Sequence, residues 1–371
     1  MSRKPMASRQ PATYKDSGVD YDAMDAFKRL AQRAASQTAG NIARLGLKDV
    51  PASRGESAYL IEAADHYLAH VEEGLGTKNL VADGLPDQPE LYANIAQDTV
   101  AMIVNDMITL GALPVSVAMH LAAGSSEWFE DQARLKALVE GWQRACNLAR
   151  CVWGGGETPT LKGVVEPGAV VLSGSAIGVI APKGRRIKGD IQSGDAIVLL
   201  ASSGVHANGL TLARQIAAKA GPDAKLSDGR RFSEALLDPT HIYVPVVEGV
   251  LAAGVDIHYA VNITGHGWRK LMRATEPFVY TIESVSPPQP VFAFIQKHGP
   301  IDDAEMYGNY NMGAGFALYV AAADVETVVK AAAASDIKAW PAGHIEKRGT
   351  TKQVVIKPKN LTYDGSTLAV R

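Results

Sequence analysis

The 371-residue sequence has few features of chains that work outside the cell or within a membrane. It has only two cysteines, Cys146 and Cys151, which excludes a disulfide scaffold. Its longest apolar stretches, such as residues 168–182, are too short and too rich in Gly and Ser to span a bilayer. Residues 1–13 are basic but have no apolar core, so they do not resemble a signal peptide. We therefore expect a cytoplasmic protein with no membrane partner.

An excess of charge of either sign is missing as well. The 37 Lys and Arg residues nearly balance the 39 Asp and Glu residues, so the net charge at pH 7 is −2. No global basic field exists that could hold nucleic acid through its phosphates. The common catalytic signatures are also missing: the sequence has no Walker A loop, no G-x-G-x-x-G after a strand, no H-E-x-x-H and no C-x-x-C. A nucleic-acid partner is thus not expected, and any catalytic site must use less familiar motifs.

Apolar residues are abundant enough for a folded core. Hydrophobic residues make up 47% of the chain and charged residues 20%, and the length suggests two domains. A polar, turn-rich segment after Pro182 is the best candidate for the domain boundary. Apolar periodicity predicts helices over 22–39, 91–111, 127–149 and 210–220, and β-branched runs predict strands over 169–180, 195–201 and 354–356. The predicted segments are a basic tail (1–13), a first domain (14–181), a second α/β domain (182–357) and a C-terminal tail (358–371).

Three acidic residues of the first half lie in polar motifs, two of them glycine loops. Glu73 precedes a glycine turn, Asp106 lies with Asn105 inside a predicted helix, and Glu157 follows three glycines. Short polar residues are costly inside a helix unless they have a role there. Carboxylate oxygens are the ligands that suit Mg²⁺ on a polyphosphate. Each acid could instead be a solvated loop, capping or turn residue, and spacing alone does not show that the three converge.

The second half has similar polar loops. Ser202, Ser203 and Gly204 precede a predicted helix, where free amides and hydroxyls could bind an anion. His206 and Asn208 follow directly, and His206 could equally be an ordinary buried or capping histidine. Two further glycine-rich polar loops lie at 262–267 and 309–315. These loops are candidates for a binding site for a small anionic substrate.

With these motifs the sequence resembles the aminoimidazole ribonucleotide synthetase family, the phosphoribosylformylglycinamidine cyclo-ligases of purine biosynthesis. The resemblance runs from about residue 14 to residue 356, nearly the whole chain. The runs Y-K-D-S-G-V-D and D-P-T-H-I-Y-V are specific to this branch of a superfamily that includes thiamine-monophosphate kinase and selenophosphate synthetase. The matching motifs are residues 14–20, 76–78, 104–106, 155–158, 202–209, 238–244, 263–265, 305–307 and 311–313.

The resemblance implies an α/β (α+β) fold with two domains, each a mixed sheet flanked by helices. It also implies a homodimer built largely through the first domain, with Mg²⁺ and ATP bound near that interface. The implied reaction converts formylglycinamidine ribonucleotide and ATP into aminoimidazole ribonucleotide, ADP and phosphate. Phosphorylation of the formyl oxygen would turn it into a good leaving group, and the tethered amidine nitrogen would then close the ring.

The resemblance further implies a role for each matching residue. The residues expected to hold the metal and phosphates are Glu73, Asp106 and Glu157, and those expected to act in catalysis are His206, Asp106 and Glu157. The residues expected to bind ATP are Lys15, Glu73, Gly76, Thr77, Lys78, Asn105, Gly155 and Gly156. The residues expected to bind the ribonucleotide substrate are Ser203, Gly204, Asn208 and Thr264.

The sequence departs from the family pattern at a few positions. Glu72 and Glu73 stand where the family usually has Thr and Asp, so a one-residue shift could exchange which acid points inward. Asn262 replaces a usual His, and His266 replaces a usual Gly. The chain is therefore identified as a divergent member. Two alternatives remain open: a related ATP-dependent phosphotransferase acting on another small molecule, and a non-catalytic paralogue that binds a nucleotide.

Overall fold

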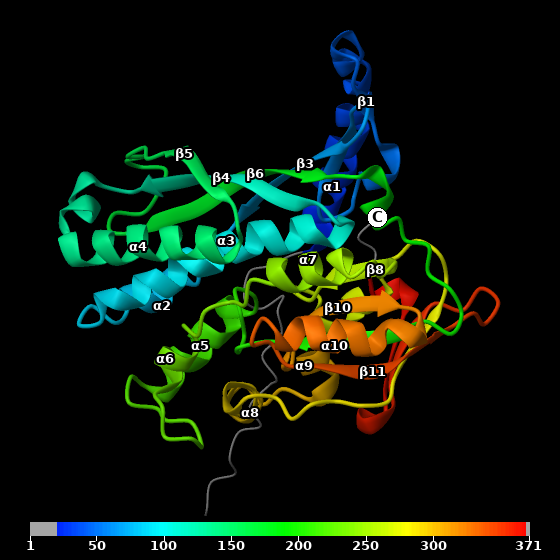
Figure 1. The fold of residues 1–371 in the computed structure, drawn as a ribbon. Coiled ribbons are helices and arrows are strands. Elements are labelled where there is room, and N and C mark those ends of the chain that lie inside the picture. Colours follow the sequence, from blue (N-terminus) through cyan, green and yellow to red (C-terminus); the bar gives the residue numbers. More distant parts are fainter. Residues whose placement is uncertain (1–20, 369–371) are drawn as a thin grey trace, which may run out of the picture.

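The computed structural model describes residues 21–368 and contains two β-sheets, each with helices packed against it (Figure 1). The first sheet has six strands in the order β1-β2-β3-β6-β4-β5. All of its neighbouring strands are antiparallel except β4 and β5, so the sheet is mixed as expected. Its strands are β1 (Lys48–Asp49), β2 (Tyr59–Glu62), β3 (Tyr67–Gly74), β4 (Leu113–Ala123), β5 (Val152–Glu157) and β6 (Val170–Ile180).

The second sheet has seven strands in the order β13-β12-β9-β11-β7-β10-β8 and is also mixed, because β12 and β9 run parallel. Its central strands β7 and β10 are almost continuously buried and apolar, which is typical of a sheet covered on both faces. Its strands are β7 (Ala196–Ala201), β8 (Ile257–Asn262), β9 (Val279–Ile282), β10 (Ala314–Val320), β11 (Ala339–Glu346), β12 (Gln353–Ile356) and β13 (Leu361–Asp364).

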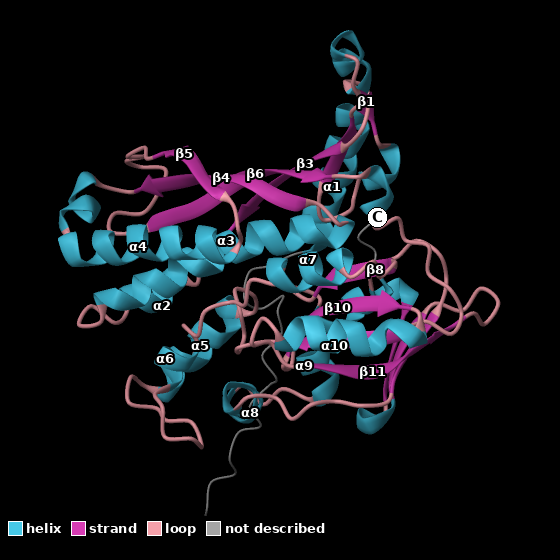
Figure 2. Ribbon diagram, in the orientation of Figure 1, coloured by secondary structure: helices cyan, strands magenta, loops and turns pink. Residues whose placement is uncertain are grey.

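Helix α3 lies between the first sheet and the second domain (Figures 1 and 2). On one side, Ile103 and Met107 of α3 pack against Gly174 and Gly178 of β6, where a Cβ atom would collide. On the other side, α3 faces the segment that leads into α7. The helices are α1 (Tyr21–Ser36), α2 (Asn79–Asp83), α3 (Tyr92–Met107), α4 (Gln132–Leu148), α5 (Leu210–Ala220), α6 (Phe232–Ala235), α7 (Val244–Ala252), α8 (Pro290–His298), α9 (Asp303–Asn309) and α10 (Val325–Ala333).

Polar side chains along α3 form a seam between the two domains. Asn94 donates to the carbonyl of Leu237 (3.1 Å), and Gln97 donates to that of Thr240 (2.9 Å). Further along, the Asn105 amide donates to the carbonyl of His241 (2.8 Å) and accepts from the backbone N–H of Tyr243 (2.9 Å). These side chains recur at helical spacing on the face of α3 opposite the sheet. The D-P-T-H-I-Y-V run is therefore held by the seam.

Two details differ from the sequence expectations. Helix α4 begins at Gln132 rather than at the predicted residue 127, because Asp131 is its N-cap and its carboxylate accepts from the N–H of Arg134. The segment after residue 357, expected to be a tail, forms β13 and pairs with β12. No helix among the described residues is long and apolar enough to cross a membrane.

Candidate active site

Two of the three expected carboxylates lie together at the seam. Glu73 ends β3, and Asp106 lies in the last turn of α3. Burial raises the pKa of Glu73 to about 7, and the negative charge of Asp106 adds to this shift. The Asp106 carboxylate accepts a 2.7 Å hydrogen bond from the amide of Asn262, at the end of β8. The cluster thus joins residues from both domains.

Cations face this carboxylate pair. The Lys270 ammonium donates a 2.5 Å hydrogen bond to the hydroxyl of Thr264. Burial lowers the pKa of Lys270 to about 8, against the opposing effect of Asp106 and Glu73. Lys28 of α1 also acts on the carboxylates, because its charge lowers the pKa of Glu73. Neither lysine belongs to a recognisable sequence motif, so neither could be predicted from the sequence, although Lys270 follows Thr264 by only six residues.

The carboxylate pair fits Mg²⁺ that is bound to a nucleotide. Among the described residues, no group of three or more His, Cys, Asp and Glu side chains could enclose a metal ion. Mg²⁺ usually binds through only one or two carboxylates and completes its coordination with water and substrate phosphates. Glu73 and Asp106 supply that number of ligands, and they are close enough for the charge of Asp106 to add to the effect of burial on the pKa of Glu73.

Glu157 lies on the opposite face of the first sheet. Glu73 is in register with Gly174, Gly174 with Met119, and Met119 with Gly156, so these four residues form one row across the sheet. Glu157 is the next residue after that row, and successive side chains of a strand point to opposite faces. Three strand spacings also separate β3 from β5, roughly 14 Å. Within a single chain, Glu157 therefore lies away from Glu73 and Asp106. The metal-binding role expected for Glu157 stays a prediction.

The same alternation distinguishes Glu73 from Glu72. Glu72 pairs with Ser175 and is exposed on the outer face of the sheet. Glu73 pairs with Gly174, the residue that lies against Ile103 of α3, and its side chain faces Asp106. The structure thus directs Glu73, not Glu72, toward the seam.

The expected glycines have structural reasons of their own. A Cβ atom on Gly156 would lie 2.3 Å from the carbonyl oxygen of Met119, so β5 can approach β4 only with glycine there. Gly155 has a φ of +131° and Gly76 has a φ of +75°, values that favour glycine. Both positions are open, with no atom close to the place of a Cβ. The backbone there is accessible, and the expected contacts of Gly76, Thr77, Gly155 and Gly156 with ATP stay predictions.

Lys78 is fully buried in the seam. Its ammonium forms a 2.7 Å ion pair with Asp98 of α3 and donates to the carbonyl of Asp238 (2.8 Å). Asp98 also accepts from the backbone N–H of Thr240 (2.8 Å). In this arrangement Lys78 joins the two domains, and its side chain has no exposed surface from which to reach a phosphate. Its expected contact with ATP stays a prediction, and Lys15 lies outside the described residues.

The polar groups of the loop at residues 202–209 largely form hydrogen bonds within the protein. The Ser203 hydroxyl donates to the carbonyl of Pro239 (2.6 Å), and its backbone N–H donates to Nε2 of His206 (3.2 Å). Ser202 donates its N–H to the carbonyl of Gly313 (3.0 Å). These donors, which the sequence suggested were free for an anion, are therefore engaged. Asn208 is half-buried near Met102, and Gly204 lies against Asp238.

His206 is buried rather than open to a substrate. Its ring packs against His241 and Tyr243, and burial holds its pKa well below the ordinary value, so the imidazole is neutral. With Nε2 accepting from Ser203, the ring fixes the conformation of the loop. The catalytic role expected for His206 stays a prediction, and the structure supports a positioning role.

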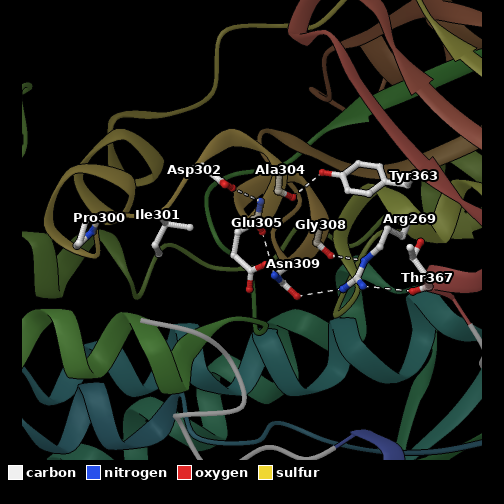
Figure 3. A pocket seen from close by; sticks show the side chains of 10 residues that line it. All are labelled: Arg269, Pro300, Ile301, Asp302, Ala304, Glu305, Gly308, Asn309, Tyr363 and Thr367. Carbon is white, nitrogen blue, oxygen red and sulfur yellow. Dashed lines mark hydrogen bonds between the residues drawn. The ribbon is translucent and has the colours of Figure 1, made fainter. Parts of the chain in front are cut away.

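A cavity of about 460 Å³ lies on the second domain, and Arg269, the residue before Lys270, lines it (Figure 3). It is lined by Arg269 of the 3₁₀ helix Gly267–Met272 and by Glu305 of the E-M-Y motif. The Arg269 guanidinium donates to the carbonyl of Gly308 (2.8 Å) and to Oδ1 of Asn309 (3.1 Å). These bonds fix the short helix against α9 and thereby set the position of Lys270, the next residue.

Comparison with known proteins assigns the family. The model of the AIR synthase related protein N-terminal domain matches residues 55–180, and that of the C-terminal domain matches residues 192–356. The phosphoribosylformylglycinamidine cyclo-ligase of Methanocaldococcus jannaschii is 36% identical over 341 residues, 90% of this chain and 92% of that protein. The chain belongs to the AIR synthase family. The protein of the same name from Paraburkholderia phymatum is 34% identical over 362 residues, 94% of this chain and 97% of that protein.

Solved structures share the fold at low sequence identity. The HypE–HypF complex has a TM-score of 0.58 at 16% identity, covering 83% of this chain and 92% of that chain. Aquifex aeolicus thiamine monophosphate kinase has a TM-score of 0.54 at 14% identity, covering 82% of this chain and 92% of that chain. Two domains with mixed sheets are thus the shared AIR synthase architecture.

One departure from the AIR synthase family pattern lies inside the site. Asn262, where the resemblance led us to expect His, donates directly to Asp106. An amide can make this bond at any pH, whereas an imidazole would make it only with the appropriate nitrogen protonated. The substitution therefore preserves a donor to the carboxylate.

The two hydrogen bonds of Asn105 in the seam lead to a testable prediction. We expect Asn105→Ala to lower the free energy of unfolding by about 2 kcal/mol, because it leaves the Tyr243 N–H and the His241 carbonyl without their partner. Asn94→Ala, which removes one partly buried bond to Leu237, should cost only about 0.5–1 kcal/mol. Urea unfolding of the two variants measures the difference. Equal losses would show that Asn105 does not hold the domains together.

Proposed function

We propose that the protein is a phosphoribosylformylglycinamidine cyclo-ligase that acts in purine biosynthesis in the cytoplasm. The observation that carries the proposal is the pair formed by half-buried Glu73 and buried Asp106 at the domain seam, facing Lys270 and Thr264. It lies in a chain similar over nine-tenths of its length to proteins of that name. Carboxylates on one domain and a cation and hydroxyl on the other suit a reaction between a nucleotide and a second substrate.

The reaction joins two steps on one bound substrate. The formyl oxygen of formylglycinamidine ribonucleotide attacks the γ-phosphorus of ATP, and ADP leaves. The amidine nitrogen then attacks the activated carbon, the carbon–oxygen bond breaks, and inorganic phosphate departs with the former formyl oxygen. Loss of a proton from the attacking nitrogen, followed by transfer of a proton from the ring methylene to the exocyclic imine nitrogen, completes aminoimidazole ribonucleotide. The reacting nitrogen and carbon belong to one molecule, so the protein mainly has to align the phosphate with the oxygen.

Different residues of the chain would bind the metal, orient its ligands and bind the ribonucleotide in this reaction. Glu73 and Asp106 would hold Mg²⁺ delivered with ATP, and that ion would neutralise phosphate charge. Asn262 keeps the Asp106 carboxylate oriented through its 2.7 Å hydrogen bond. Thr264 lies on the opposite side, where the ribonucleotide would bind. The buried seam around Lys78 and Asn105 holds these two sides in register.

The direct test is formation of aminoimidazole product. We expect the purified protein to form one aminoimidazole ribonucleotide, detected by diazo coupling, for each ATP consumed. Omission of either ATP or Mg²⁺ should abolish the product. A phosphorylated ribonucleotide that accumulates without ring closure would instead support a phosphotransferase. Nucleotide binding without turnover would support a non-catalytic paralogue.

We also propose that the protein is a homodimer through the first sheet. In Figure 1, α3 and α4 cover one face of this sheet, and no described helix covers the other. On that outer face, Val152, Val171 and Ile177 remain 61%, 49% and 54% exposed. Exposed apolar side chains gathered on one face are typical of an interaction surface.

The dimer gives a second prediction. Light scattering at micromolar concentration should report about twice the 39.3 kDa mass of one chain. Ile177→Lys should shift the protein toward the monomer, because it places a charge in the apolar contact. Val139→Lys, a change at a 46% exposed position on α4, should leave the mass unchanged. A wild-type protein of 39 kDa at this concentration would contradict the proposal.

A further inference from the structure

The ammonium of Lys270 lies at the junction of the two domains and uses little of its hydrogen-bonding capacity. It carries three N–H donors, of which Thr264 accepts one at 2.5 Å. Among the described residues, no ion pair joins it to a carboxylate. The Lys270 side chain is half-buried, so its remaining donors are accessible to a bound group. An anionic group that reaches Lys270 could accept charge-assisted hydrogen bonds from them.

Charges around Lys270 come from both domains. Asp106 and Glu73 of the first domain stabilise its charged form, and Lys28 and Arg273 oppose it. Among the described residues neither carboxylate is ion-paired with Lys270, so both act on it through space. A phosphate bound beside these groups could accept from the ammonium directly, and Mg²⁺ bound to that phosphate could be held by the carboxylates.

Contacts made by the residues on either side of Lys270 fix its backbone in place, independently of the charges around its ammonium. Arg269, the preceding residue, is held by Gly308 and Asn309 of α9, and the following Leu271 is fully buried. The Tyr319 hydroxyl donates to the Leu271 carbonyl (2.6 Å). The short helix that carries Lys270 is therefore rigid, as a group that must meet a reacting atom requires.

We propose that Lys270 is a catalytic residue that contacts the phosphoryl group as it passes from ATP to the formyl oxygen. This inference rests on the proposed function, in which the carboxylates belong to the nucleotide side and Thr264 to the ribonucleotide side. Lys270 is bonded to Thr264 on the ribonucleotide side and its charge is stabilised by both carboxylates of the nucleotide side, so a phosphoryl group that moves between the two sides passes it. Its ammonium then stabilises negative charge on the transferred oxygens, without giving up its proton.

The test compares nucleotides with and without the transferred group. Lys270→Met should weaken binding of AMPPCP with Mg²⁺ by about 10–100-fold, the effect of losing a charge-assisted hydrogen bond. It should change binding of ADP with Mg²⁺ by less than about 3-fold. Titration calorimetry measures both affinities. Turnover should fall by about 100–1000-fold in kcat with little change in the KM of the ribonucleotide.

Further variants distinguish a direct contact between Lys270 and the γ-phosphate from a purely structural role of Lys270. Lys270→Arg should recover part of the AMPPCP affinity, because it keeps a charged donor. Lys297→Met removes an exposed lysine from α8 of the same domain and should match the wild type in both affinities. Equal losses for AMPPCP and ADP in Lys270→Met, or no loss for either, would overturn the inference. A wild-type protein that makes no aminoimidazole would refute the proposed function instead, and the nucleotide comparison would still decide whether Lys270 meets the γ-phosphate.

Discussion

Glu73→Gln is expected to lower activity by at least about 10–100-fold, whereas Glu72→Gln leaves it nearly unchanged. Glu73 faces Asp106 at the seam, and its replacement removes a charge that would bind Mg²⁺. Glu72 is exposed on the opposite face of the sheet, so it serves as the matched control. Raised Mg²⁺ should partly restore Glu73→Gln, because mass action offsets weaker binding. Full activity in Glu73→Gln with loss in Glu72→Gln would reverse the assignment.

The same substitution should stabilise the ligand-free protein above pH 7. Folding raises the pKa of Glu73 from 4.5 to about 7, chiefly through burial, so the folded state keeps a proton that the unfolded chain releases. The wild-type protein therefore loses stability as pH rises from about 4.5 to 7, and a glutamine does not. We expect Glu73→Gln to gain about 1–3 kcal/mol at pH 8 and much less at pH 5. Urea unfolding at the two pH values measures this gain, and a loss at pH 8 would contradict it.

Lys78→Met is expected to give the largest loss of stability, about 3–5 kcal/mol. It removes the partner of Asp98 and leaves that carboxyl group fully buried and held only by Thr240, while burial raises its pKa. The double variant Lys78→Met/Asp98→Asn should recover part of the loss, because the asparagine oxygen can still accept from Thr240 without a buried charge. Urea unfolding of the single and double variants measures the recovery. If Lys78 contacts phosphate instead, Lys78→Met would lose affinity for Mg²⁺ and ATP while remaining as stable as the wild type.

The elements with strong local signals could be predicted from the sequence. The predicted strand 169–180 is β6 (Val170–Ile180), because alternating small and β-branched residues suit a sheet with one covered face. The predicted helix 210–220 is α5 (Leu210–Ala220), which begins after the left-handed Gly209. The order of strands within each sheet could not be predicted, because it depends on contacts between segments far apart in the chain. Only the whole-chain resemblance supplied the architecture.

The candidate site was harder to predict because it depends on where each side chain points as well as on which residue it is. The sequence placed Glu73 and Glu157 beside glycines and Asp106 inside a predicted helix, but only strand register shows that Glu157 points away from the other two. Lys78 and His206 stand in motifs that suggested ligand contact, but both are buried, Lys78 against Asp98 in the seam and His206 against His241 and Tyr243. Asn105 is the converse case: two polar residues inside a helix indicated a role, and the structure assigns Asn105 to the seam.

The most direct measurement follows the formyl oxygen. Substrate labelled with ¹⁸O at that atom should be converted by the protein, with ATP and Mg²⁺, into aminoimidazole ribonucleotide and inorganic phosphate. If the oxygen is phosphorylated and then expelled, each phosphate released carries one ¹⁸O atom, which mass spectrometry detects. Label that appears in water, or phosphate released unlabelled in step with ring closure, would contradict the account.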